Sequence, residues 1–207
     1  MKKIISSVSV LSLLLLLISC AKVPKADVDA AKLSIETAKK TGADRYAPVS
    51  FQTAVNSLRL GLVQVEGQNS KFALFRNYDA AKTTLTSVIP LSNKAVEETA
   101  SRKEALKAEV TDAVAELTST IAADKELLAK APKGKDGKPA VLSIGQEIQV
   151  VETVLNGVSA GLTNNENILT LFEKVKPAVE KAKTINTELT EVIAKAKWMH
   201  RLNSHSK

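Results

Sequence analysis

The sequence predicts an all-α protein, built as an elongated antiparallel helical bundle or as stacked helical hairpins with one very long kinked helix. Three observations support this class. Apolar residues recur at spacings of three and four along most of the chain after residue 27. Lysines and glutamates are interleaved along the same segments, as on solvated helix surfaces. Aromatic residues make up only 3% of the 207 residues, so the core is expected to be thin and formed by close helix contacts.

The first two predicted helices are separated by a short linker. Acidic residues in the first turn, lysines in the last turn and a following Gly42 predict a helix over residues 27–40. The linker ends at Pro48, because proline suits the first position of a helix. Gly61 in this second helix either weakens it or permits close approach of a neighbour, and both readings stay open. The apolar stripe of the second helix is expected to run through Phe51, Ala54, Val55, Leu58, Leu62 and Val65 to Phe72 and Phe75.

A third, very long helical segment is predicted over residues 79–131. Lys103 and Asp124 interrupt its apolar stripe, and Pro90 opposes helix formation because proline removes a backbone hydrogen bond. We expect one bent helix or two nearly collinear helices, spanning about 80 Å at about 1.5 Å per residue. The predicted stripe contains Ala81, Leu85, Val88, Ser92, Val96, Leu106, Val110, Ala113, Leu117, Ile121 and Leu128.

The remaining segments predict two more helices and a free tail. Residues 132–139 form a lysine- and glycine-rich loop, and the capping-box pattern that starts at Ser143 predicts that the next helix begins there. Pro177 marks either a kink or the start of the last helix, and Trp198 is expected to cap the apolar end of the bundle. Residues 27–200 are therefore predicted to form a single elongated domain, followed by a disordered tail over residues 201–207. The apolar positions of these helices are Ile148, Val151, Leu155, Val158, Leu162, Ile168, Leu169, Phe172, Val175, Ala182, Ile185, Leu189, Val192, Ile193 and Ala196.

The N-terminal residues have the three parts of a secretory signal. Lys2 and Lys3 precede an apolar run from Ile4 to Ile18. Ser19 and Cys20, the only cysteine, follow this run. The run is short for a transmembrane helix, which needs about 20 predominantly apolar residues. Residues 1–19 are therefore expected to be a signal peptide, and residues 20–26 a tether.

The segment Leu17-Ile18-Ser19-Cys20 resembles the lipobox of bacterial lipoprotein signal peptides. The resemblance implies cleavage between Ser19 and Cys20 and fatty acylation of Cys20, so palmitate and other acyl chains would be the whole membrane attachment. By the same resemblance, Ala21 in place of aspartate favours the outer membrane of the cell envelope. Whether the protein faces the periplasm or the cell surface stays open.

A second resemblance covers residues 27–100. The pairs Ala30-Ala31 and Gly42-Ala43, the run Tyr46-Ala47-Pro48 and the run from Asn77 to Ala81 are similar to an alanine-rich helical domain of unknown function in bacterial envelope lipoproteins. Asn77 stands where that domain usually has glycine. The resemblance implies tetratricopeptide-like helix packing and a location in the cell envelope. It does not imply any catalytic activity.

The sequence marks no reaction centre, metal site or cofactor site. The mature chain carries 27 basic and 22 acidic residues, interleaved rather than gathered as in nucleic-acid-binding proteins. The loop at residues 132–139 lacks the ending and the preceding strand of a phosphate-binding P-loop. The two histidines, His200 and His205, lack further ligands for a metal. We therefore expect a non-enzymatic structural or adaptor protein that binds a partner protein of the envelope. The alternatives are a surface-exposed lipoprotein that binds host or environmental molecules, or a carrier of an apolar ligand, and the oligomeric state stays open.

Overall fold

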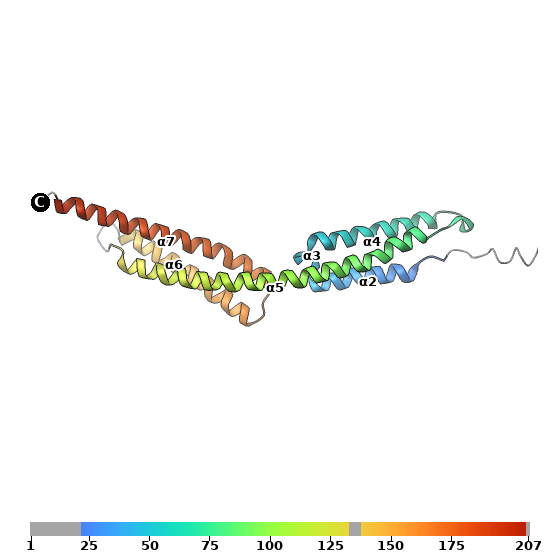
Figure 1. Cartoon of the computed structure of the whole chain (residues 1–207), viewed down its shortest axis with the longest axis horizontal. Coiled ribbons are helices and arrows are strands. Elements are labelled where there is room, and N and C mark those ends of the chain that lie inside the picture. The colour runs from blue at the N-terminus through green and yellow to red at the C-terminus, as the bar shows by residue number, and fades with distance from the viewer. Residues whose placement is uncertain (1–21, 133–137, 206–207) are drawn as a thin grey trace, which may run out of the picture. The chain divides into compact units, whose positions relative to one another are not determined.

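The computed structural model describes residues 22–132 and 138–205, and this part of the chain contains helices and no strand (Figure 1). The all-α class is confirmed. One helix, α5, has 52 residues and fits the very long helix predicted over residues 79–131. The elements are α2 (Lys25–Thr41), α3 (Ala43–Tyr46), α4 (Pro48–Asn69), the 3-10 turn η1 (Ala73–Phe75), α5 (Asp79–Lys130), α6 (Lys138–Thr163) and α7 (Ile168–His205).

The chain divides into two compact units rather than the single domain expected over residues 27–200. Unit 1 extends to Arg102 and unit 2 begins at Lys103, so α5 contributes its first part to unit 1 and its second part to unit 2. The hydrophobic contacts explain the division. Apolar clusters of unit 1 combine α2, α3 and α4 with the start of α5, whereas another cluster combines the later part of α5 with α6 and α7.

In unit 1, α2 and α4 run antiparallel beside the first part of α5 (Figure 1). Gly42 ends α2 in the left-handed conformation, with φ of 91°, and its backbone N–H caps the carbonyls of Ala38 and Lys39. Pro48 stands in the first turn of α4, as predicted. The linker between them differs from the expected loop because it contains the one-turn helix α3.

The core of unit 1 is made largely by small side chains. Ala31, Ala38 and Ala54 are fully buried, and Gly61 on α4 lies directly against Leu85 of α5. A Cβ atom at Gly61 would lie 2.8 Å from Leu85 Cδ2, which is closer than real contacts allow. Of the two interpretations of Gly61, the structure therefore supports the one in which glycine permits a neighbouring helix to approach closely.

Unit 2 packs the later part of α5 against α6 and α7 around branched aliphatic side chains. Its fully buried residues include Val110, Leu117, Val158, Val175, Ile185 and Leu189. Ion pairs cross its surface between helices, such as Lys183 Nζ with Glu116 Oε1 at 2.8 Å and Lys125 with Glu152. The predicted stripes of these helices therefore face a common core.

The two prolines that were expected to kink or separate helices lie inside continuous helices. Pro90 belongs to α5 and Pro177 belongs to α7, so neither residue separates two helices. The start of α6 and the end of α7 differ from expectation. Helix α6 begins at Lys138 rather than at Ser143, with Pro139 in the first turn, where a missing backbone N–H costs no helical hydrogen bond. Helix α7 continues to His205, where a disordered tail was expected from residue 201.

Candidate functional site

The predicted lipidation site lies outside the described residues. Ser19 and Cys20 precede Lys22, the first residue of the described chain, and residues 133–137 of the lysine-rich loop also lie outside it. Val23 packs against the unit 1 cluster that contains Val65 and Tyr78. Helix α2 therefore starts five residues after Cys20, with the chain already held against unit 1 at Val23. Within the described part of the chain, no helix combines the length and the hydropathy needed to cross a membrane.

The described side chains offer no metal cluster. No three side chains of His, Cys, Asp or Glu come together among them in a metal-binding group. His200 and His205 lie in the last turns of α7, and their side chains are outside the described part. Trp198, expected to cap the apolar end of the bundle, is instead 58% exposed on α7, so that expectation is wrong.

One buried polar contact joins α5 to α7. Asp124 is only 1% exposed, and its Oδ1 accepts a hydrogen bond from Asn186 Nδ2 at 2.7 Å. Its second oxygen, Oδ2, is buried and accepts no hydrogen bond from the described residues. Burial raises the pKa of Asp124, and the hydrogen bond from Asn186 partly opposes this effect. The sequence reading treated Asp124 as a break in the apolar stripe, but it faces the core.

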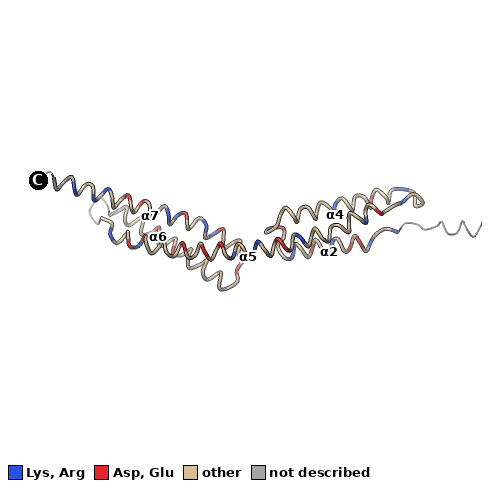
Figure 2. Tube along the Cα trace, viewed as in Figure 1, with Lys and Arg blue, Asp and Glu red and all other residues tan. Residues whose placement is uncertain are grey.

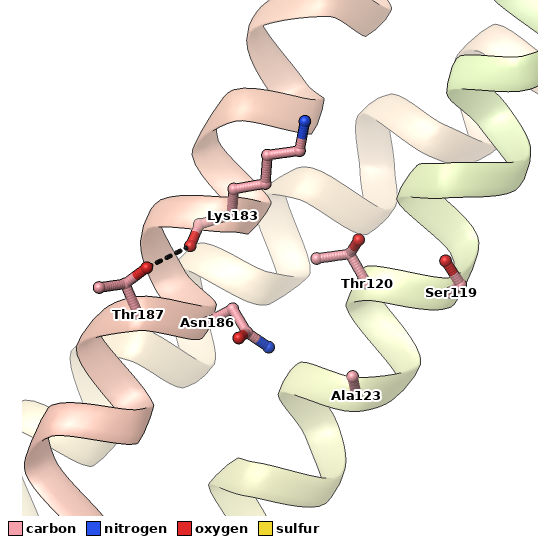
Figure 3. Close-up of a pocket in the computed structure, with 6 residues that line it drawn as sticks. All are labelled: Ser119, Thr120, Ala123, Lys183, Asn186 and Thr187. Carbon is pink, nitrogen blue, oxygen red and sulfur yellow. Dashed lines mark hydrogen bonds between the residues drawn. The ribbon is translucent and has the colours of Figure 1, made fainter.

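A depression of about 450 Å³ lies beside this contact, between α5 and α7 (Figure 3). Its hydroxyl groups are already engaged within their own helices. Ser119 and Thr120 both donate to the carbonyl of Glu116, and Thr187 donates to the carbonyl of Lys183. The three hydroxyl hydrogen atoms are therefore satisfied by backbone carbonyls of the helices that carry them.

Helix α4 carries an exposed apolar face that sequence reasoning missed. Val49, Leu60 and Val63 are 80%, 54% and 59% exposed. At about 100° per residue these three side chains fall within about 60° of one another around the helix. Gly67 falls on the same face, and a Cβ atom there would meet nothing within 4 Å. The positions between them on this face are Thr53 and Asn56, so this outer face of α4 is uncharged.

A second exposed apolar feature is the turn between α4 and α5, residues 71–76, named here the aromatic turn. Phe72, Leu74 and Phe75 are 69%, 67% and 75% exposed, and the two phenylalanine rings lie 6.3 Å apart between centroids. Sequence reasoning placed both phenylalanines on the buried stripe. The helix ends at Asn69 instead, and the polar run Gln68-Asn69-Ser70 was the signal that could have predicted this end.

Comparison of the chain with protein-family models, with curated proteins and with solved structures gives no match. The assignment of function therefore depends on the sequence motif at Cys20 and on the surfaces described above.

Proposed function

We propose that the chain is a lipid-anchored bacterial envelope protein that works without catalysis, as a structural or adaptor component through helical protein–protein contacts. The lipobox-like segment ending at Cys20 supports the anchor. The similarity of residues 27–100 to a helical domain of envelope lipoproteins supports the setting. Ala21 supports placement in the outer membrane by the sorting rule of the lipoproteins that the segment resembles.

The observation that carries the adaptor role is the uncharged outer face of α4. A monomeric surface helix normally presents charged and polar residues opposite its buried stripe. Helix α4 buries Ala54, Gly61 and Val65 on one side and exposes Val49, Leu60 and Val63 on the other. Exposed apolar patches of this kind mark places where proteins associate.

The chemistry of this face fits an apolar helix of another envelope protein. Leu60 and Val63 offer aliphatic contact area, whereas Thr53 and Gly67 are small enough to let a partner backbone approach closely. Such a contact is the helix-in-groove kind of recognition, in which spacings of three, four and seven residues supply the anchors.

The anchor is tested by labelled-palmitate incorporation and intact mass. The wild-type chain is expected to incorporate the label and to start at Cys20, whereas Cys20→Ala is expected to incorporate none. An unlabelled wild-type chain that starts at Met1 would remove the anchor and the envelope placement. Protease shaving of intact cells then distinguishes a periplasmic from a surface-facing chain.

The adaptor role is tested by photo-crosslinking from α4 in living cells. A photoreactive side chain at Leu60 or Val63 is expected to give one discrete adduct, identified by mass spectrometry. The same group at Lys32, exposed on α2, is the matched control and is expected to give none. Val49→Glu, Leu60→Glu and Val63→Glu combined should abolish the adduct from a probe at Gly67. Equal labelling from Lys32, or an adduct that contains only a second copy of this chain, would contradict the adaptor role.

A further inference from the structure

The aromatic turn is held in a defined conformation by hydrogen bonds from both sides. Arg76 Nε donates to the carbonyl of Lys71 at 2.9 Å, and Arg76 Nη2 donates to the carbonyl of Asn69 at 2.8 Å. The backbone N–H of Asn77 donates to Gln68 Oε1 at 3.1 Å. The hydroxyl of Tyr78, which is 2% exposed, donates to Asn69 Oδ1 at 2.6 Å. The exposure of the apolar side chains is therefore built into the turn.

Three large apolar side chains within four residues form a concentrated patch on this turn. Phe72, Leu74 and Phe75 each leave about two thirds or more of their surface in water. Lys71 and Arg76 flank them directly in the sequence. Exposed phenylalanine and leucine bordered by basic residues are typical of segments that enter the boundary between lipid headgroups and acyl chains.

The turn lies at the same end of unit 1 as the start of α2 (Figure 1). Helix α4 runs antiparallel to α2, so the end of α4 returns to the place where α2 begins. The contacts agree, because Val23 belongs to the same cluster as Val65 near the end of α4 and Tyr78 before α5. Figure 2 shows basic residues at both places. By sequence, Lys22 and Lys25 stand at the start of α2, and Lys71 and Arg76 stand in the turn.

The length of chain before α2 limits the distance to the proposed anchor. Lys25 is the fifth residue after Cys20, and a fully extended chain spans at most about 3.6 Å per residue. The start of α2 therefore lies within about 18 Å of the acylated Cys20. With Cys20 acylated as proposed above, the end of unit 1 that carries the aromatic turn would be the end next to the membrane.

We propose that the aromatic turn is a second membrane contact, in which Phe72, Leu74 and Phe75 enter the headgroup boundary of a bilayer with anionic lipid while the flanking basic residues meet the headgroups. For its place at the membrane this inference rests on the proposed lipid anchor at Cys20. The acyl chains at Cys20 would already hold the protein on the membrane, because two or more chains anchor stably. The turn adds a protein contact with the lipid and fixes which end of unit 1 faces it.

The insertion is tested on the lipidated full-length chain in vesicles of phosphatidylcholine and phosphatidylglycerol. Leu74→Cys is labelled with bimane, and brominated lipids report its contact with acyl chains by quenching. Val49→Cys is the matched control, because Val49 is exposed at the opposite end of α4, about 30 Å away along the helix. We expect quenching at position 74 and none at position 49. Equal quenching at both positions, or none at 74, would overturn the inference while leaving the anchor intact.

A second measurement separates the turn from the anchor. The mature chain with Cys20→Ser carries no lipid, and its flotation with the same vesicles reports the turn alone. Phe72→Ser combined with Phe75→Ser is expected to weaken this binding at least about tenfold, since each phenylalanine loses a buried apolar side chain. Leu33→Ser, at an exposed apolar position on α2 that belongs to neither proposed surface, is the control and should leave binding unchanged. Unchanged binding of the Phe72/Phe75 variant, or shielding of position 74 only when an envelope protein is added, would overturn the membrane contact.

Discussion

The two units pack helices in different ways. Unit 1 fully buries Ala31, Ala38, Ala43, Ala54 and Ala95, and places Gly61 against Leu85. Unit 2 fully buries leucine, isoleucine and valine, such as Leu117, Ile185 and Val158. Small side chains let helix backbones approach closely, whereas branched side chains fill the space between more widely spaced helices. Unit 1 should therefore be sensitive to added volume, and unit 2 to removed volume.

The largest expected effect is the loss of a buried leucine from unit 2. Leu117→Ala is expected to lower the free energy of unfolding of unit 2 by about 3 kcal/mol, because it removes apolar contacts and leaves a cavity. Hydrogen exchange followed by mass spectrometry measures the change separately for peptides of each unit. Leu142→Ala, at an exposed position of α6, is the control and should have little effect. An equal loss of protection in α2 and α4 would mean that the units unfold together.

The second prediction concerns the buried carboxyl of unit 2. The folded chain binds the Asp124 proton more tightly than the unfolded chain, in which the pKa of aspartate is about 3.9. The contribution of Asp124 to stability therefore falls as pH rises from about 4 through its raised pKa. Asp124→Asn cannot titrate, so its stability relative to wild type should rise over this range. The rise is about 1.4 kcal/mol for each unit by which the pKa is raised.

Urea unfolding between pH 4 and pH 7 measures this difference. Asp112→Asn, at an exposed position on α5, is the matched control. The control should follow the wild-type dependence on pH. A constant difference between wild type and Asp124→Asn across the range would show that burial does not shift the titration of Asp124.

The contrast between the units also explains which features the sequence could predict. Helix ends with local signals were predicted well, such as Gly42 after α2 and Pro48 at the start of α4. The burial of Asp124 could not be predicted, because its partner Asn186 lies 62 residues away on another helix. The local capping pattern at Ser143 was misleading, since α6 already begins at Lys138.

The exposed surfaces were missed for a related physical reason. Periodicity identifies an apolar stripe but does not distinguish a stripe that faces the core from one that continues past the end of a helix. Phe72 and Phe75 fit the spacing of the buried face of α4, yet the chain leaves the helix at Asn69. Val49, Leu60 and Val63 form a second stripe, which becomes visible only once the buried face is known.

The third prediction compares two glycines of α4 and tests the close approach in unit 1. Gly61→Ala is expected to destabilise by about 1 kcal/mol, because the clash with Leu85 outweighs the gain in helix propensity. Gly67→Ala meets open space and is expected to stabilise by up to about 1 kcal/mol. Thermal or urea unfolding monitored by circular dichroism measures both. Effects of the same sign would mean that Leu85 can move aside without cost.

The smallest expected effect is that of Ser92→Ala, which helps to separate the roles of side-chain size and hydrogen bonding in unit 1. Ser92 is 1% exposed on α5, and its Oγ lies 3.1 Å from Ser34 Oγ on α2. The hydroxyl of Ser34 donates to the carbonyl of Ala31, so Ser92 is the donor in the contact between the two serines. Ser92→Ala therefore removes this donor and leaves no buried donor without a partner. It should lower the free energy of unfolding by less than about 1 kcal/mol.

Ser92→Val is the matched change, because it removes the same hydroxyl and adds volume. It should cost about 1–3 kcal/mol, since the added methyl groups face α2 at the site of the serine contact. Urea unfolding of the two variants measures the difference. If Ser92→Ala were the more damaging change, hydrogen bonding between α2 and α5 would matter more than their close approach. The proposed contrast between unit 1, packed through small side chains, and unit 2, packed through branched side chains, would then fail. Unit 1 would depend on polar contacts rather than on small side chains.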